Sequence, residues 1–444
     1  MGWVTIRMSI RGVNPKVAQS VNQEGFLFKP LLFKEGLKMN EKPRTAKLIL
    51  GICFLFILSL LFCIAAEAAE VPKEIKIGTS ISKTGPMAAF GLYEEWGYTA
   101  AVNDINKAGG VYLSKYNKKL PVKLFLYDDE TRPEKVVEHA ERLILRDKVH
   151  ALLSSGSPPL VIPGGNVAER EGIPMSAAAC PIRAFLGARE QWNWVWDLFF
   201  DELDMTRQQF LTLNTVQTNR KVALFTDNEQ DGVVMGELWN KNAKEFNYEV
   251  VYHARFPVGT TEYGDLIRRA QEGKADAMIC QMIPPDAIAL WKQIKTLGYK
   301  PKAAFFEKGG ETLEWWQANG QAAQGTMVAG YWHPRLGYPG AKELRERFEK
   351  EKGQTYSQHI ADFYASCQIL LDAIGRAGIL EPKAINAEMA KTNKTYLVGP
   401  VKYTVGKGAH AAALPTFMVQ WQNGDVEIVY PAKLATAKMI FPLP

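Results

Sequence analysis

The chain has 444 residues, of which 47% are apolar and 23% charged, so its composition is that of a folded protein and its length predicts two or three domains. The formal net charge of +6 lies almost entirely in residues 1–68, which contain 9 Lys or Arg and 4 Asp or Glu and leave 44 basic and 43 acidic residues in the rest. The body of the protein therefore has no basic excess that would attract nucleic acid, and we expect no nucleic-acid partner.

The charged leader has the layout of a secretory signal. From Met39 the chain reads "MNEKPRTAK", then the apolar run "LILGICFLFILSLLFCIAAEAAE", which contains the small-residue exit "AEA". This order predicts a signal peptide over residues 39–68, cleaved after Ala68, with residues 1–38 as an upstream extension and a periplasmic or extracytoplasmic location. An uncleaved membrane anchor is the alternative, because the run of about 18–20 residues is just long enough to span a bilayer. A lipid-anchored start at Cys63 is less favoured, because Phe62 stands where a small residue would be expected.

Strand-like and helix-like segments alternate after the leader. The first series consists, in chain order, of the strand "EIKIGTSI", the helix "YEEWGYTAAVNDINKAGG", the strand "LPVKLFLYDD", the helix "TRPEKVVEHAERLILRDK", the strand "VHALLSSG", the helix "PGGNVAEREG" and the short strand "IPMSAAAC". This alternation predicts a parallel sheet flanked by helices.

A second series with the same layout begins near Lys221. It consists of the strand "RKVALFTD", the helix "GVVMGELWNKNAKEF", the strand "YEVVYHARF", the helix "TTEYGDLIRRAQEG", the strand "ADAMICQM", the helix "PDAIALWKQIKTLG" and the strand "KPKAAFFEKG". The aromatic stretch "QWNWVWDLFF" separates the two series, and short strands with Gly and Asn turns form the tail from about residue 398. Two similar α/β lobes are the fold class that this pattern predicts.

The segment "GTSISKT" (78–84) comes close to a phosphate-binding loop but does not match one. Three residues instead of four follow Gly78, and Ser82 stands where the second glycine should be. That glycine lets backbone amides surround the phosphates, and no G-x-G-x-x-G fingerprint is present in this loop either. A nucleotide-dependent α/β enzyme is therefore a minor alternative.

Motifs for other chemistry are equally weak. No G-x-S-x-G elbow is present, Cys180 has no histidine partner that the sequence indicates, and the scattered cysteines and histidines predict neither a disulfide framework nor a metal site. The carboxylates of "YDDE" (127–130) could be an acid and base pair, but acidic residues at a strand end more often cap helices or bind loop amides. We expect no catalytic residues, no metal and no cofactor.

Three loops follow predicted strands of the first series, at residues 80–90, 154–159 and 176–181. Ligands of open α/β sheets bind outside the carboxyl ends of the strands. Small residues dominate the last two loops, "SSGSPP" and "SAAACP", and let a ligand approach backbone amides, which suit a carboxylate where a helix begins. Tight turns alone would also explain this composition, so the residues by themselves leave both interpretations open.

Over residues 74–444 the sequence resembles the type I periplasmic solute-binding proteins of ABC transporters, of the branched-chain amino acid type. The segments that carry the resemblance are "IKIGTSISKTGPMAAFG", "AAVNDINKAGG", "LYDDETRPEKVVEHAERLI", "EREGIPMSAA", "FTDNEQDG", "GYWHPRLGYPGAKEL", "SQHIADFYASCQILLDAI" and "VGPVKYTVGKGAH". No single segment is decisive, but their order over more than 300 residues is highly specific.

The resemblance implies two Rossmann-like lobes joined by three crossovers, with a small molecule in the cleft and closure by a hinge motion. Lobe 1 would comprise residues 74–198 and 330–399, and lobe 2 residues 199–329 and 400–444. The closed protein would deliver its ligand to a membrane permease, with ATP hydrolysed by a separate subunit. The ligand-binding positions that the resemblance implies are Phe90, Ser155, Gly156, Ser157, Ala179, Cys180, Asp231, Met282, Ile283 and Glu307.

Several of these positions depart from the family pattern. Cys180 replaces a hydroxyl by a thiol, a poorer hydrogen-bond partner, and the aromatic residues of lobe 2 are missing. Asp231 or Glu307 could still hold an ammonium group, so an amino acid and another small carboxylate or amide both remain open as ligands. A ligand sensor that uses the same lobes to signal to a partner protein is the alternative function.

Overall fold

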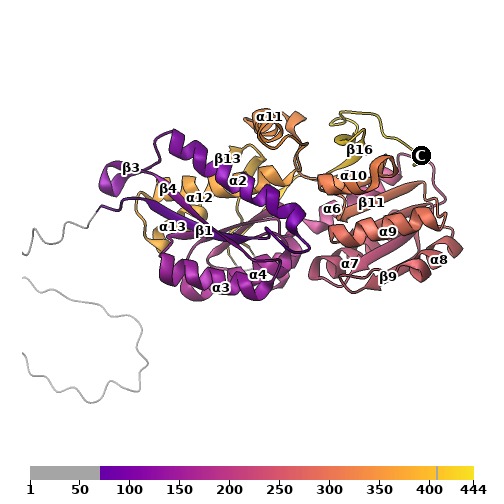
Figure 1. Cartoon of the computed structure of the whole chain (residues 1–444), viewed down its shortest axis with the longest axis horizontal. Helices are drawn as coiled ribbons and strands as arrows, with labels where there is room; N and C mark the ends of the chain where they lie inside the picture. Colours follow the sequence, from indigo (N-terminus) through magenta and orange to yellow (C-terminus); the bar gives the residue numbers. More distant parts are fainter. Residues whose placement is uncertain (1–70, 407–408) are drawn as a thin grey trace, which may run out of the picture. The chain divides into compact units, whose positions relative to one another are not determined.

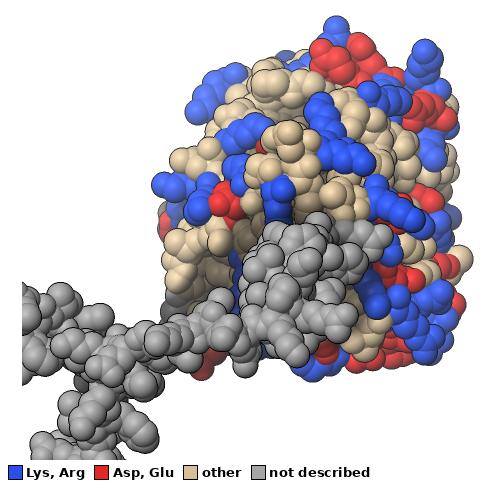
Figure 2. Space-filling view, turned by 90° about the vertical axis from the view of Figure 1, so that its left-hand side faces the viewer, with Lys and Arg blue, Asp and Glu red and all other residues tan. Residues whose placement is uncertain are grey.

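A computed structural model describes residues 71–406 and 409–444. The predicted extension and signal peptide, residues 1–38 and 39–68, lie outside these residues. Within the described residues, no helix combines the length and apolar character that crossing a membrane requires. On the face shown in Figure 2, Lys and Arg side chains are interspersed with acidic and neutral residues, in keeping with the balanced charge of this part of the sequence.

Residues 71–444 form one compact unit built on two sheets (Figure 1). The first sheet has six parallel strands in the order β15-β7-β6-β5-β1-β4. Its strands are β1 (Ile75–Ile81), β4 (Val122–Asp128), β5 (Ala151–Leu153), β6 (Met175–Ala178), β7 (Val195–Phe200) and β15 (Ala411–Leu414). Strands β1 and β4 pair along their full lengths, from Ile75 opposite Val122 to Ile81 opposite Asp128.

Helices cover both faces of the first sheet. Helices α2 (Ala88–Lys107) and α12 (His359–Ala377) pack against each other on one face, with α13 (Pro382–Met389) beside α12. Helices α3 (Pro133–Arg142), continued by the π-turn Leu143–Asp147, and α4 (Pro158–Glu171) cover the other face. The short helix α5 (Ile182–Gly187) follows β6.

The second sheet has seven strands in the order β17-β16-β12-β11-β10-β8-β9. Its strands are β8 (Lys221–Asp227), β9 (Glu249–Phe256), β10 (Ala277–Met282), β11 (Ala303–Lys308), β12 (Met327–Gly330), β16 (Phe417–Gln422) and β17 (Asp425–Tyr430). The first five are parallel, and β16 and β17 add an antiparallel edge. Both predicted α/β lobes are therefore present.

Helices also flank the second sheet. They are α6 (Glu202–Leu213), α7 (Gln230–Glu245), α8 (Gly264–Glu272), α9 (Pro284–Thr296) and α10 (Leu313–Asn319). Helix α11 (Ala341–Lys352) lies between β12 and α12 in the chain. The remaining described strands form two antiparallel pairs, β2 (Val111–Leu113) with β3 (Lys118–Leu120) and β13 (Asn393–Tyr396) with β14 (Gly399–Lys402). The 3-10 turns are Ser114–Tyr116, Gly320–Ala323 and Pro334–Leu336.

The chain passes between the sheets three times. The first two passages follow β7 and β12, close to the predicted boundaries at 198 and 330. The third passage differs from the predicted boundary at 400, because β15 pairs in parallel with β7 of the first sheet and only β16 joins the second. The crossover therefore lies between Leu414 and Phe417.

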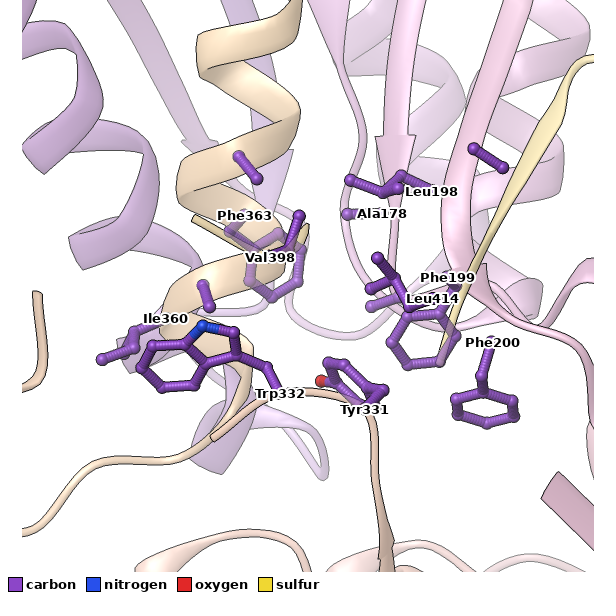
Figure 3. Close-up of a cluster of buried hydrophobic side chains, with 14 of the residues drawn as sticks. Ala178, Leu198, Phe199, Phe200, Tyr331, Trp332, Ile360, Phe363, Val398 and Leu414 are labelled. Carbon is purple, nitrogen blue, oxygen red and sulfur yellow. The ribbon is translucent and has the colours of Figure 1, made fainter. Parts of the chain in front are cut away.

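Aromatic side chains pack together where these passages meet. Figure 3 shows Phe199 and Phe200 from the first passage, Tyr331 from the second and Leu414 from the third in a single buried cluster. The ring centroids of Phe199 and Tyr331 are 4.7 Å apart, and those of Phe199 and Phe200 are 4.3 Å apart. Buried aromatic pairs of this kind stabilise by packing and fix the spacing of the three connections.

Candidate ligand-binding cleft

A cavity lies between residues from both sheets, at the carboxyl ends of their parallel strands. This is where open α/β sheets bind ligands. The cavity is lined by Met87, Phe90, Glu94, Gly156, Ser157, Pro158, Ala179, Pro181, Phe199, Phe200, Asp231, Met235, Gln281, Glu307, Lys308, Glu311, His359 and Phe363. It encloses about 450 Å³ with its mouth included. The two walls are close together, because Lys308 Nζ on one side lies 3.1 Å from the Ser157 hydroxyl on the other.

Phe90 lies in the first turn of α2. The sequence predicts a loop as far as Phe90, but the helix already begins at Ala88, because the turn at Gly85 (φ 88°) ends the loop and two alanines, strong helix formers, follow. The Phe90 ring packs edge-to-face on His359 at 4.8 Å between centroids. With Met87 and Ala89 it forms an apolar cluster with Ile283, which follows β10 of the second sheet. This contact joins the two lobes beside the cavity.

The small-residue loops of the first lobe are held in place from behind by two buried acids. Both oxygens of Glu94 accept backbone N–H groups, from Gly156 at 3.0 Å and from Ser82 at 3.3 Å. Burial and the neighbouring Asp129 raise the pKa of Glu94 to about 8. Asp129 itself accepts the hydroxyls of Ser82 at 2.7 Å and Ser155 at 2.8 Å. These bonds fix the loop that carries Gly156 and Ser157.

The pair Asp128 and Asp129 holds loops, as acidic residues at a strand end are expected to do. Asp128 accepts the Thr84 hydroxyl at 2.9 Å and the Glu130 backbone N–H at 3.0 Å. Lys83 forms an exposed ion pair with Glu95 at 2.7 Å. Lys83 and Thr84, which gave the segment its likeness to a phosphate loop, are thus engaged with neighbouring acids.

Lys308 is the central charged residue of the second wall and was missed by the sequence analysis. Its side chain is 9% exposed, and its Nζ donates to Glu229 and, at 3.4 Å, to Asp231. The third contact crosses the cavity to the Ser157 hydroxyl, at 3.1 Å. Burial alone would lower the pKa of Lys308, but Asp231, Glu229 and Asp227 outweigh it and raise that pKa.

Asp227, Glu229 and Asp231 place one carboxylate oxygen each within 4.8 Å of one another, a spacing that a cation could occupy. The Lys308 ammonium already contacts two of them. Burial and the neighbouring Asp231 raise the pKa of Asp227 to about 8, which reduces the negative charge of the group. The Lys308 ammonium thus provides a positive charge at the place where a cation bound by these three carboxylates would lie.

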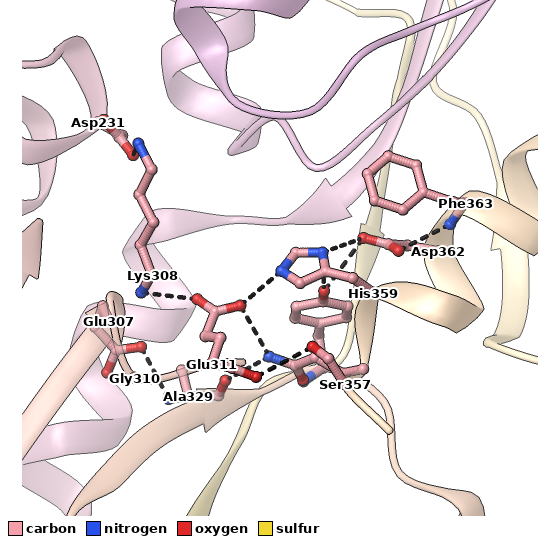
Figure 4. A network of polar contacts seen from close by, with 12 residues as sticks. Asp231, Glu307, Lys308, Gly310, Glu311, Ala329, Ser357, His359, Asp362 and Phe363 are labelled. Atoms are coloured by element: carbon pink, nitrogen blue, oxygen red, sulfur yellow. Dashed lines mark hydrogen bonds and ion pairs between the residues drawn. The ribbon is translucent and has the colours of Figure 1, made fainter. Parts of the chain in front are cut away.

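A second charged bridge crosses between the lobes at His359, on α12. Its Nε2 lies 2.8 Å from Glu311 Oε2, and its Nδ1 lies 3.1 Å from Asp362 Oδ2 and 2.8 Å from the Tyr331 hydroxyl (Figure 4). Burial would lower the pKa of His359, but Asp362 and Glu311 raise it to about 10. His359 is therefore a cation at neutral pH, enclosed by carboxylates from both sides.

Three non-glycine residues on the cavity wall have a left-handed backbone. They are Ser157 (φ 74°), Ala179 (φ 55°) and Lys308 (φ 61°), and each lies at or just after the carboxyl end of a strand. Such conformations cost free energy and concentrate at binding and active sites. Their position on opposite walls of one cavity supports a functional role for this cavity.

Six of the ten sequence-predicted positions line the cavity: Phe90, Gly156, Ser157, Ala179, Asp231 and Glu307. The other four lie close by, outside the lining. Ser155 turns its hydroxyl to Asp129, Cys180 and Met282 are buried in apolar cores, and Ile283 packs on Phe90. Burial raises the pKa of the Cys180 thiol well above its usual range.

A sequence profile described as periplasmic binding protein matches residues 74–425. A curated relative, the Leu/Ile/Val-binding protein homolog 8 of Brucella abortus (strain 2308), is 24% identical over 417 residues, which cover 90% of this chain and 99% of that one. Among solved structures, a branched-chain amino acid transporter substrate-binding protein from Streptococcus pneumoniae in complex with isoleucine matches with a TM-score of 0.71 at 20% identity, covering 81% of this chain and 100% of that one. A solute-binding protein of an ABC transporter from Rhodopseudomonas palustris BisB5, in complex with 3,4-dihydroxybenzoic acid, matches with a TM-score of 0.68 at 18% identity, covering 80% and 95%.

Proposed function

The chain belongs to the periplasmic binding protein family, and we propose that it is the extracytoplasmic solute-binding component of an ABC importer. In this proposal it captures a small amino acid or another small carboxylate between its lobes and delivers it to a membrane permease, without a chemical step of its own. The observation that carries the proposal is the cavity whose lining comes from both sheets, at the carboxyl ends of their strands.

Closure would occur around the three connections that meet at Phe199, Tyr331 and Leu414. The contact between Lys308 and Ser157 across the cavity supports this, because a ligand placed between them needs the lobes to part or Lys308 to swing aside. The proposed ligand contacts are Phe90, Gly156, Ser157, Ala179, Asp231 and Glu307, with Lys308 added by the structure.

Thermal-shift measurement of the purified protein against a panel of amino acids, aromatic and aliphatic carboxylates and amides tests the proposal, with calorimetry on every hit. We expect at least one small molecule to raise the melting temperature and to bind with a stoichiometry of one. A protein that binds no member of a broad metabolite panel, or that turns a member over, would contradict the proposal.

The permease is tested separately. The transporter encoded beside this chain, reconstituted in liposomes, should hydrolyse ATP faster when the ligand-loaded protein is added. Unchanged ATPase activity, together with ligand-dependent binding to a neighbouring kinase or regulator, would favour a sensor in place of a transport component.

A further inference from the structure

The acidic side chains on the cavity wall already accept protein donors at every oxygen. Among the described residues that line the cavity, four carry a carboxyl group, and a protein donor lies on each of their eight oxygens. Glu94 accepts Ser82 N and Gly156 N, Asp231 accepts Gly232 N, Gln281 Nε2 and Lys308 Nζ, Glu307 accepts Gln209 Nε2 and Ala329 N, and Glu311 accepts Lys308 N, Gln358 Nε2 and His359 Nε2. A ligand ammonium group would therefore have to share an oxygen that already accepts a protein donor.

Glu307, which the sequence analysis considers for an ammonium, is the clearest case. Its oxygens accept Gln209 Nε2 at 2.7 Å and Ala329 N at 2.9 Å, both within the second lobe. Burial raises the pKa of Glu307 to about 8, so the group is mostly uncharged at neutral pH. A neutral carboxyl group whose two oxygens already accept hydrogen bonds attracts a cation only weakly.

Lys308, in contrast, has one weakly used donor. Two of its three N–H groups go to acids of its own lobe, Glu229 and Asp231, and these hold the ammonium in place. The third crosses the cavity to the neutral hydroxyl of Ser157 at 3.1 Å. A carboxylate is a much stronger acceptor for an ammonium than a hydroxyl is. A carboxylate ligand at the Ser157 loop would therefore take this donor at a gain.

Gln281 provides an unpaired hydrogen-bond acceptor close to Lys308. Its Nε2 donates to Asp231 Oδ2 at 2.7 Å, which fixes the orientation of the amide, and its side chain is almost fully buried. Its Oε1 is the only buried side-chain polar atom without a partner among the described residues of the lining. An unpaired buried acceptor is costly, and a ligand hydroxyl or amide N–H would satisfy it.

We propose that the ligand of this cleft is a carboxylate without an ammonium group, bound by Lys308 and Ser157, with Gln281 accepting a hydrogen bond from an uncharged donor such as a hydroxyl. This proposal rests on the proposed binding function and narrows its ligand class. An α-amino acid would bring its ammonium next to the Lys308 ammonium, in a site where each oxygen of the lining carboxylates already accepts a protein donor, and the repulsion between the two like charges disfavours binding.

Calorimetry on the unmodified protein tests the proposal with ligands that differ at one carbon. The first series is 4-methylpentanoate, 2-hydroxy-4-methylpentanoate and leucine, and the second is 3-phenylpropanoate, 3-phenyllactate and phenylalanine. We expect a carboxylate or hydroxy acid to bind and its amino counterpart to bind at least about 100-fold more weakly. Equal or tighter binding of leucine or phenylalanine would overturn the proposal.

The failure of this proposal is distinguishable from failure of the binding function. If only amines, amino acids or uncharged compounds bind, the ligand class is wrong and the binding function stands. If no member of the broad metabolite panel binds at all, both fail.

Variants at Lys308 test the role of its charge. Lys308→Met alone leaves buried acids unpaired and can prevent folding, so the decisive variant is Lys308→Met with Asp231→Asn. We expect the double variant to bind the preferred carboxylate at least about 30-fold more weakly and to lose much less affinity for the corresponding neutral amide. Lys342→Met, at an exposed lysine of α11, is the matched control and should bind like the unmodified protein. Unchanged carboxylate affinity in the double variant would overturn the assignment.

Discussion

The two walls of the cleft are built in different ways. The first lobe presents small-residue loops and aromatic rings, and its buried acids Glu94 and Asp129 hold loop groups in place. The second lobe presents charge directly to the cavity, with Lys308 set between Glu229 and Asp231. Apart from His359, the first wall therefore fixes shape, and the second fixes charge. Substitutions in the first wall should therefore act mainly through packing, and substitutions in the second wall mainly through electrostatics.

Lys308→Met should have the largest effect on stability. The substitution leaves Glu229 and Asp231 without their counter-charge in a buried position, and breaking such a pair costs about 3–5 kcal/mol. Urea denaturation measures this loss, and the added Asp231→Asn substitution should restore part of it. A Lys308→Met protein as stable as Lys342→Met, where the lysine is exposed, would contradict the idea that the second wall depends on charge pairing.

Phe90→Ala should have the next largest effect, by loss of packing in the first wall. The ring is 4% exposed and packs on His359 and Ile283, so its removal should cost about 3 kcal/mol in the free energy of unfolding. Ligand affinity should fall with it, whatever the ligand's charge. If Phe90→Ala instead weakens the binding of charged ligands and neutral ligands to different extents, the first wall does not act by packing alone.

Stability should fall as pH rises from about 6.5 to about 10. The pKa of His359 is raised to about 10, so its stabilising charge is present below its usual value of 6.5 and is lost as pH approaches 10. The pKa of Glu94 and of Glu307 is raised to about 8, so the folded state holds protons that the unfolded chain has already released, and stability declines up to that pH. Histidines whose pKa is lowered, such as His253, act only below this window.

Thermal unfolding measured across this pH range tests the expectation. Glu307→Gln removes one titrating group without changing its shape and should flatten the decline below pH 8. Stability that rises with pH across the window would show that the buried acids are ionised in the folded protein.

Ser157→Ala and Ser155→Ala should show the smallest and most specific difference. Ser157 contributes one hydrogen bond to Lys308, so its loss should cost about 1 kcal/mol of stability and about tenfold in carboxylate affinity. Ser155 donates to Asp129 behind the wall, so Ser155→Ala should lower stability and leave affinity unchanged. Equal effects of the two variants on binding would place the carboxylate elsewhere.

The two-lobe fold could be predicted from the sequence because alternating strand and helix patterns are local signals. The loops of the first wall could be found for a similar reason, since Gly156, Ser157 and Ala179 lie within four residues of the ends of β5 and β6. The third crossover was placed too early, because the pairing of β15 with β7 joins segments more than 200 residues apart and leaves no local mark.

The charged wall could not be predicted in the same way. Glu307 and Lys308 are neighbours at the end of β11, where alternation would send them to opposite faces, yet both line the cavity. The left-handed backbone of Lys308 breaks the alternation and turns its side chain toward Ser157. A lysine in the sequence does not predict this backbone conformation, as a glycine would. His359 and Glu311 lie 48 residues apart, and only the folded chain brings them together.

A crystal structure of the protein with the ligand that it retains through purification tests the central claim most directly. We predict a small molecule in the cleft with a carboxylate oxygen in contact with both Lys308 Nζ and Ser157 Oγ, and no ammonium group near Glu307. A ligand ammonium bonded to Glu307 or Asp231, or a ligand bound away from this cavity, would contradict the account.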